Sequence, residues 1–525
     1  MFGLRQPARS RARGSAKSSA VSLPAPVGGL NARDSIANMK ASDAIILDNW
    51  FPQTTEVQVR RGYTEFATFT GICQSIIAYN GASSKVFVAV DGSTNSIIDA
   101  SSGGAISTAV VGGSGPTVQA ITDCHFDYVN FGTVGGQFLS LVNGADTPLE
   151  YDGTTWSSST MTGGTPADFF TVAVYAERLW FGVKNSFSVR YLPVNSITGA
   201  TTELNLASLF KLGGTLNSII TITDATNALA DYIAFVSTEG EIVAFTGTDP
   251  AVATSWTRAA QFRVGRPVIN GNRAWCKWGA DALLICADGI LPLRRAISQE
   301  TRDSTVAVSD KIRNMLNNDV AVHGARKGWA ITLHPTGFKL IVNVPTNEDV
   351  EARQYVMNVQ TGAWCRYTGW DGFCFDVVRD QLYWGGDGVL AKADQPGAAS
   401  DAGNPITASS KQAFSYLGGR GRNVLMQMIR PIIAADGAAN IALGVDVDYG
   451  DVEPATFIQV GGGSGDPWGG IWDVSWGGAL EVVKSWRTAQ GFGSAIAPRM
   501  RTQTLDVSLS WSASDLVYEH ATFGP

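Results

Sequence analysis

Charged residues are scarce in this sequence. Asp, Glu, Lys and Arg make up 16% of the 525 residues, whereas they form about a quarter of an average soluble domain. The formal net charge of −7 disfavours a protein whose main task is to hold nucleic acid by electrostatic attraction. An acidic surface past which DNA slides is compatible with this charge.

Long apolar runs are also missing. No uninterrupted stretch reaches the length of about 18 apolar residues that a membrane-spanning helix needs, so we expect no such segment. No apolar region follows the basic N-terminus, so we expect no secretory signal. These features predict synthesis in the cytoplasm.

Cysteine and histidine are few and scattered. None of the six cysteines forms C-x-x-C, and none of the four histidines forms H-E-x-x-H or a similar pair. Isolated thiols in a large chain are typically buried and unpaired; spacing alone does not establish a bridge between Cys276 and Cys286 or between Cys365 and Cys374. No G-x-S-x-G motif precedes a helix. We therefore predict no catalytic residue, no metal site and no cofactor.

Glycine, tryptophan and apolar residues are abundant. The chain has 58 glycines and 15 tryptophans, 45% of its residues are hydrophobic, and long amphipathic helical patterns are rare. This composition provides for large cores and many turns, which favours β structure. We predict an all-β protein, and its length favours two or three domains.

One strand–turn–strand unit recurs along the chain. Its clearest copy is Ala282–Leu293, where Asp288-Gly289 separates two apolar runs; Asp-Gly favours a tight hairpin because both residues tolerate positive φ. Six steps separate the turn at residue 91 from that at residue 387, and (387 − 91)/6 is about 49 residues, within the period of about 40–50 residues of propeller blades. We predict a β-propeller of six or seven blades over residues 66–396. The other turns are Asp91-Gly92, Asn143-Gly144, Asn185, Glu239-Gly240, Pro335 to Gly337 and Asp387-Gly388.

Three tryptophans follow turns within these repeats. They are Trp156 in Y-D-G-T-T-W, Trp256 in A-T-S-W and Trp364 in N-V-Q-T-G-A-W. Large aromatic side chains bury much apolar area, and in propellers such a tryptophan typically packs between adjacent blades. We interpret all three as structural blade residues.

The N-terminal 23 residues form a basic arm. Arg5, Arg9, Arg11 and Arg13 lie among Ser, Ala and Gly with no aliphatic stripe, a composition that predicts an extended segment without a core of its own. Such an arm suits the acidic surface of an adjacent subunit, and it also suits DNA phosphates.

Two short helices and two further regions are expected. A helical turn is predicted at Ala44–Leu47 within a docking segment, residues 24–65, and a helix is predicted after Ser309-Asp310. Residues 397–408 have the composition of a linker. Residues 409–525 predict a C-terminal β-sandwich-like domain.

The docking segment carries a motif in the order G-G-L-N-x-R-D, D-A-I-x-L-D-N-W-F-P and V-x-V-R-x-G-Y. This order resembles the N-terminal segment of tail nozzle proteins, also called hub or tail tubular proteins, of short-tailed bacteriophages, in which it precedes a β-propeller. The tryptophan-rich C-terminal region, followed by K-S-W-R and P-R-M-R, is similar to the end of the same proteins.

The resemblance implies a structural virion protein. It implies a ring of six copies below the portal and adaptor proteins, which forms the nozzle of a phage tail, contacts the genome during ejection and offers attachment points for tail fibres. The residues that we expect to serve assembly are the arm arginines together with Asp34, Asp48, Asn49, Trp50 and Arg61.

Two alternatives remain open from the residues. One is a propeller-type glycan-degrading enzyme; the D-G-T-T-W segment departs from the S-x-D-x-G-x-x-W box of sialidases, and a carboxylate pair facing the central pocket would favour an enzyme. Asp446 and Asp448 also share one face of a predicted strand. The other alternative is a receptor-binding module at the tail tip, which the many tryptophans favour.

Overall fold

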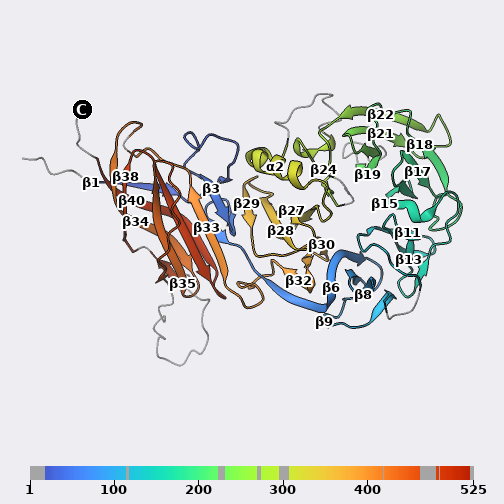
Figure 1. Cartoon of the computed structure of the whole chain (residues 1–525), viewed down its shortest axis with the longest axis horizontal. Coiled ribbons are helices and arrows are strands. Elements are labelled where there is room, and N and C mark those ends of the chain that lie inside the picture. The colour runs from blue at the N-terminus through green and yellow to red at the C-terminus, as the bar shows by residue number, and fades with distance from the viewer. Residues whose placement is uncertain are drawn as a thin grey trace, which may run out of the picture.

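The computed structural model describes residues 18–113, 118–222, 231–268, 273–294, 307–417, 419–460, 481–483 and 485–520. These residues form mainly β-strands, in a propeller on the right of Figure 1 and a two-sheet domain on its left. Among them, no helix is long and apolar enough to cross a membrane.

The described strands of the propeller form seven blades, which resolves the predicted choice between six and seven. The first four blades consist of β6 (Tyr63–Tyr79), β7 (Lys85–Asp91), β8 (Ser96–Asp99) and β10 (Ala109–Gly112); β11 (Asp127–Thr133), β12 (Gly136–Val142), β13 (Leu149–Tyr151) and β14 (Trp156–Ser158); β15 (Phe169–Tyr175), β16 (Arg178–Val183), β17 (Ser188–Tyr191) and β18 (Thr202–Asn205); and β19 (Leu216–Ile222), β20 (Tyr232–Ser237), β21 (Glu241–Gly247) and β22 (Trp256–Arg263). Strand β9 (Gly104–Ala105) pairs with β6.

Blades five to seven complete the ring. They consist of β23 (Trp275–Trp278), β24 (Asp281–Cys286) and β25 (Gly289–Pro292); β26 (Ala330–His334), β27 (Lys339–Asn347), β28 (Glu351–Asn358) and β29 (Trp364–Tyr367); and β30 (Cys374–Val378), β31 (Gln381–Gly385) and β32 (Asp387–Ala393), with β6 as the outer strand. Each of the seven predicted turns falls in a different blade. Six of them join the second and third strands, and the turn at Pro335 to Gly337 joins the first and second.

A single long strand closes the propeller. The first part of β6 pairs with β32 in blade seven, up to Ile72, and its second part pairs with β7 in blade one, from Ile72 to Tyr79. The strand therefore serves two blades, and the backbone groups that would otherwise be an open sheet edge are paired.

The helix α2 (Arg313–His323) follows a 3-10 turn, η3 (Asp310–Ile312), between blades five and six. Ile312 and Leu316 are fully buried, as their spacing predicts. The Ser309 side chain makes no cap hydrogen bond to this helix; its hydroxyl accepts the Ile290 N–H instead (3.0 Å), which ties the helix start to blade five.

The second domain packs two sheets face to face. One sheet has the order β37-β34-β40-β5-β4, with β1 paired to β40 and β38 paired to β34; the other continues from β29 of the propeller through β3-β33-β39-β35-β36, with β2 on β3. The apolar core between them includes Met426, Ile429, Ile496 and Leu516. The strands are β33 (Ile406–Gln412), β34 (Val424–Ala435), β35 (Ala439–Val447), β36 (Ile458–Val460), β37 (Glu481–Val483), β38 (Arg487–Gly493), β39 (Ile496–Thr504) and β40 (Leu509–His520).

The N-terminal segment is part of this sandwich, and two predictions about it are wrong. Ser18–Pro24 forms strand β1 against β40, so residues 18–23 belong to the sandwich and not to the predicted arm. The helical turn predicted at Ala44–Leu47 is strand β3, because pairing with β33 outweighs the local signal. The remaining strands here are β2 (Gly29–Leu30), β3 (Asp43–Asp48), β4 (Trp50–Pro52) and β5 (Val57–Val59).

Because Trp364 and Trp156 each begin the outermost strand of a blade, they form a matched pair for mutation. Trp364 has no exposed surface, whereas Trp156 is partly exposed. We expect Trp364→Ala to lower the free energy of unfolding by about 3–5 kcal/mol and Trp156→Ala to lower it by less. Urea titrations of both variants measure the difference, and equal losses would refute the assigned burial.

Candidate functional site

Asn49 and Arg60, which belong to the motif of the docking segment, lie together at the junction of the two domains. Arg60 is the centre of this cluster, and its side chain is 1% exposed. Its Nε donates to Asn49 Oδ1 (2.8 Å), and its two terminal nitrogens donate to both carboxylate oxygens of Asp401 (2.7 and 2.6 Å). The carbonyl oxygens of Arg61 (3.2 Å) and Thr368 (2.9 Å) accept the remaining two bonds. All five N–H donors of the guanidinium are thereby used.

Asn49 supports this arginine from a backbone conformation that few residues adopt, with φ of 58°. Its side-chain oxygen also accepts the Thr368 N–H (2.9 Å), and its amide nitrogen donates to the Thr407 carbonyl oxygen (2.8 Å). Asparagine is one of the residues that tolerate positive φ. The D-N-W turn therefore joins the docking segment, blade six and β33.

The neighbouring motif residues add an ion pair and an aromatic contact. The Asp48 carboxylate accepts two hydrogen bonds from Arg366 on β29 (2.7 and 2.6 Å). Trp50 is fully buried and packs on Trp511 of β40 with ring centroids 5.8 Å apart. Both contacts lie within this chain and connect parts that are far apart in sequence.

The other predicted assembly residues are placed differently. Asp34 lies at the surface and accepts a hydrogen bond from Arg33, which also pairs with Asp310 before helix α2. Arg61 is exposed, and its side chain donates a hydrogen bond to the Asp394 carbonyl oxygen (3.4 Å). The four arm residues Arg5, Arg9, Arg11 and Arg13 lie outside the described residues. Arg61 was predicted for assembly and Arg60 was not, although Arg60, the first residue after β5, is the buried one of the two.

The three predicted blade tryptophans contact aromatic side chains or backbone of a neighbouring unit. Trp156 packs on Phe87 of blade one (4.9 Å between centroids), and Trp256 stacks on Trp180 of blade three (5.4 Å). Trp364 donates its indole N–H to the Val308 carbonyl oxygen (3.2 Å), between blades five and six.

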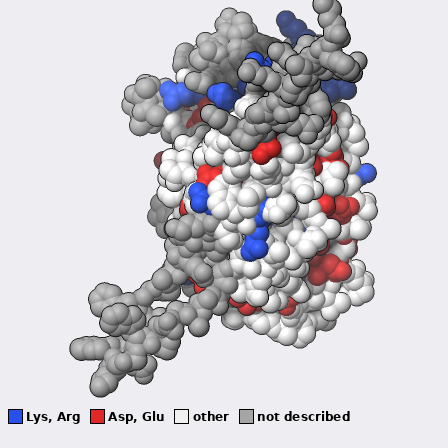
Figure 2. All heavy atoms as spheres, turned by 90° about the vertical axis from the view of Figure 1, so that its left-hand side faces the viewer, with Lys and Arg blue, Asp and Glu red and all other residues white. Residues whose placement is uncertain are grey.

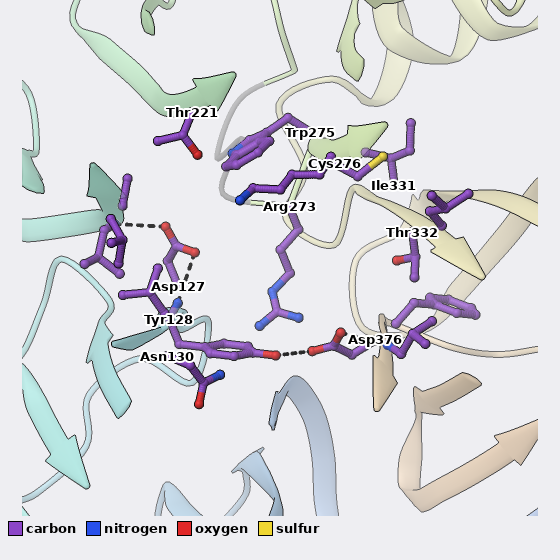
Figure 3. Close-up of a pocket in the computed structure, with 18 residues that line it drawn as sticks. Asp127, Tyr128, Asn130, Thr221, Arg273, Trp275, Cys276, Ile331, Thr332 and Asp376 are labelled. Atoms are coloured by element: carbon purple, nitrogen blue, oxygen red, sulfur yellow. Dashed lines mark hydrogen bonds between the residues drawn. The ribbon is translucent and has the colours of Figure 1, made fainter. Parts of the chain in front are cut away.

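The propeller also contains a central pocket of about 650 Å³. Residues of six innermost strands line it, and blade one contributes none of the lining. Pockets of about 300–1,000 Å³ are typical of small-molecule sites. Figure 3 shows its charged and aromatic side chains.

The floor of this pocket is built around Arg273. Its Nη2 donates to the carbonyl oxygens of Ile76 (3.1 Å) and Phe126 (3.2 Å), and its guanidinium lies over the Tyr128 ring at 5.6 Å. Tyr128 in turn donates its hydroxyl to the Asp376 carboxylate, as Figure 3 shows. Arg273 also lines a second cavity of about 30 Å³, so its side chain lies between the two spaces.

Two carboxylates, Asp127 and Asp376, flank Arg273 (Figure 3). Burial raises the pKa of Asp127 to about 6, although the Thr171 hydroxyl (2.7 Å) and the Val172 N–H (3.0 Å) both donate to it. Burial likewise raises the pKa of Asp376 and holds that of Tyr128 well above its usual range. Burial opposes the charge of Arg273, but Asp376 and Tyr128 raise its pKa.

A carboxylate pair facing the central pocket was expected to favour an enzyme, but Asp127 and Asp376 were not predicted to form it. Asp127, Arg273 and Asp376 come from three blades, and no local motif connects them. By contrast, Asp446, one of the two acids predicted to share a strand face, is buried between Lys411 (2.9 Å) and Arg499 (3.2 Å). No group of three or more metal-binding side chains occurs among the described residues.

No protein-family model and no curated protein matches the sequence. Solved structures with a similar fold include BBS1N in complex with ARL6DN, with 11% identity, a TM-score of 0.39, and coverage of 65% of this chain and 99% of that chain. The Cps50 (Swd1) β-propeller domain of Myceliophteria thermophila has 11% identity, a TM-score of 0.39, and coverage of 64% and 100%. Sqt1 of Saccharomyces cerevisiae has 10% identity, a TM-score of 0.33, and coverage of 64% and 97%. This chain is an all-β protein with a propeller, and such distant neighbours do not assign its function.

The neighbouring arginines of the V-R-R-G-Y segment, which connects β5 to β6, allow a controlled test of the junction. Arg60→Leu leaves Asp401 buried without its partner, so we expect the free energy of unfolding to fall by about 3–5 kcal/mol. Arg61→Leu changes an exposed side chain and should alter it by about 0.5 kcal/mol or less. Chemical denaturation measures both, and equal effects would contradict the role of Arg60.

The raised pKa of Asp127 predicts a pH-dependent stability. The folded state binds the proton more tightly than the unfolded chain, whose pKa is about 3.9, so this group's contribution to stability falls as pH rises from about 4 to about 6. Asp127→Asn removes the charge and keeps an acceptor oxygen. The native chain loses this contribution as pH rises, whereas the variant does not. The free energy of unfolding of Asp127→Asn minus that of the native chain should therefore increase by about 1–3 kcal/mol between about pH 4 and pH 7.

Urea titrations across this pH range provide the measurement. Asp387→Asn, at an exposed position on β32 away from the pocket, is the control and should show no such trend. A stability difference for Asp127→Asn that does not change with pH would show that this carboxyl is not perturbed by folding.

Proposed function

We propose that this chain is a structural subunit of a short phage tail, in which copies of it form a ring-shaped nozzle for genome ejection. The observation that supports the proposal is the position of the motif that resembles the N-terminal segment of tail nozzle proteins. Its residues Asp48, Asn49, Trp50 and Arg60 join the propeller to the sandwich. A subunit that bears mechanical load in a tail needs its propeller and sandwich to be firmly attached to each other.

The apolar core supports this interpretation because it crosses the junction. Trp50 and Trp511 of the sandwich belong to the same buried cluster as Trp364, Trp370 and Trp384 of the propeller. A core that continues between two domains restricts their relative motion, whereas a small polar interface permits it. Each copy would then act as one rigid element of the ring.

The size of the central pocket bears on where DNA would run. The pocket of about 650 Å³ has the size of a small-molecule site, and Arg273 lies at its floor. A conduit for the genome would therefore lie between copies, around the axis of a cyclic ring. A net charge of −7 suits such a lumen, because a strongly basic wall would hold DNA.

The sandwich end offers a surface for neighbouring subunits. Figure 2 views this end of the molecule, where the described atoms carry few charges over its middle. Leu425 and Phe492 are cross-strand partners on β34 and β38, and they are 40% and 50% exposed. Edge strand β1, which the basic arm precedes in the sequence, lies at the same end (Figure 1). This end would contact another copy, the portal and adaptor proteins, or tail fibres.

A specific observation favours one alternative, a propeller-type glycan-degrading enzyme. Asp127 and Asp376 face the pocket from different blades, and a carboxyl with a pKa of about 6 is suited to general acid catalysis. Both carboxylates, however, accept hydrogen bonds from within the protein, from Thr171 and Tyr128. We therefore rank this function second.

Immunogold electron microscopy of virions from the phage that encodes the chain tests the assignment. With an antibody against residues 409–525, we expect gold only at the tip of a short tail. Unlabelled virions together with abundant free protein in the lysate would contradict the nozzle. Release of reducing ends from host surface glycans, lost in Asp376→Asn, would then identify the enzyme.

A further inference from the structure

The central pocket has polar groups that the fold itself leaves unused. Lys277, Thr221 and Thr332 line it, and none of the three side chains has a hydrogen-bond or ion-pair partner among the described residues. Figure 3 shows the hydroxyls of Thr221 and Thr332 pointing from opposite walls toward the space between them. Because a ligand site needs a few oriented polar groups on otherwise packed walls, these three are candidates for ligand contacts.

The charges that face the pocket are balanced. Asp127 and Asp376 provide two carboxylates, and Arg273 and Lys277 provide two cations. A strongly anionic ligand would meet the carboxylates, and a strongly cationic one would meet the guanidinium and the ammonium group; in a partly desolvated site, like charges repel appreciably. A neutral ligand with several groups that both donate and accept hydrogen bonds avoids both costs.

One wall is aromatic. Trp275 on β23 lines the pocket and is partly exposed, and Figure 3 places it between Thr221 and Cys276. An indole offers a large apolar face together with a polar N–H. The carbon face of a sugar ring is complementary to such a surface, while the hydroxyls at its rim can reach the threonines, the lysine and the carboxylates.

We propose that this pocket binds a neutral saccharide of one to three sugar units. The volume of about 650 Å³ accommodates a ligand of this size. Trp275 packs against a ring, Thr221, Thr332 and Lys277 bond its hydroxyls, and the Arg273–Asp376 floor limits its depth. The site lies in one propeller, so it requires neither a ring of copies nor hydrolysis, and it does not depend on the nozzle assignment.

Binding is measured on the full chain by isothermal titration calorimetry and saturation-transfer NMR. The probes are maltose, lactose and N,N′-diacetylchitobiose, which are neutral, with glucuronic acid and glucosamine as charged comparisons. We expect saturable binding of at least one neutral probe at about millimolar concentration or below. The charged probes should bind at least about tenfold more weakly.

Two variants assign the binding to this pocket. Lys277→Met and Thr332→Val remove groups without partners in the described fold, so both proteins should fold normally, and each should weaken binding by about tenfold. Lys40→Met, an exposed lysine outside the pocket, is the matched control and should bind as the native chain does.

Three results would overturn the proposal. They are the lack of saturable binding for all three neutral probes up to about 20 mM, stronger binding of a charged probe, and affinities that Lys277→Met and Thr332→Val leave unchanged. Virion labelling is a separate measurement, so failure of the saccharide site and failure of the nozzle assignment are distinguishable.

Discussion

The buried guanidinium of Arg60 is the interaction on which the arrangement of this molecule depends. A charge that is 1% exposed is tolerated only when it is paired and fully hydrogen-bonded. Here its five donors require the Asn49 side chain, the Asp401 carboxylate and the Thr368 carbonyl oxygen in one place. These partners belong to the docking segment, the connection to the sandwich and blade six, so the network positions the two domains relative to each other.

The closure of the propeller begins immediately after this point. Two residues separate Arg60 from the start of β6, and β6 then pairs with both blade seven and blade one. The strand that closes the ring is therefore anchored at the domain junction. Since closure removes the open sheet edge, the same part of the chain secures both the propeller and its attachment to the sandwich. This double role explains why the motif residues are concentrated in the docking segment.

The domain junction and the central pocket differ in how their charged side chains are paired. At the junction, Arg60 is paired with Asp401 and Arg366 is paired with Asp48, which suits a permanent structural role. In the central pocket, Asp127 and Asp376 keep raised pKa values beside Arg273, and Lys277 has no partner among the described residues. Perturbed groups around a pocket are typical of sites that meet a ligand. A propeller can carry both, because its scaffold places few constraints on the side chains at the channel.

The sequence by itself determined the β class, the blade period and the position of the turns, because these follow from alternation and from residues that tolerate positive φ, as at Asp288-Gly289. It also singled out Asn49 and Trp50, although as assembly residues. Tertiary structure alone decided that Ala44–Leu47 is a strand, that Arg60 is the buried arginine, and that Asp127, Arg273 and Asp376 meet. Local patterns record the geometry of one segment, whereas strand pairing and burial depend on residues hundreds of positions away, such as Asp401 for Arg60.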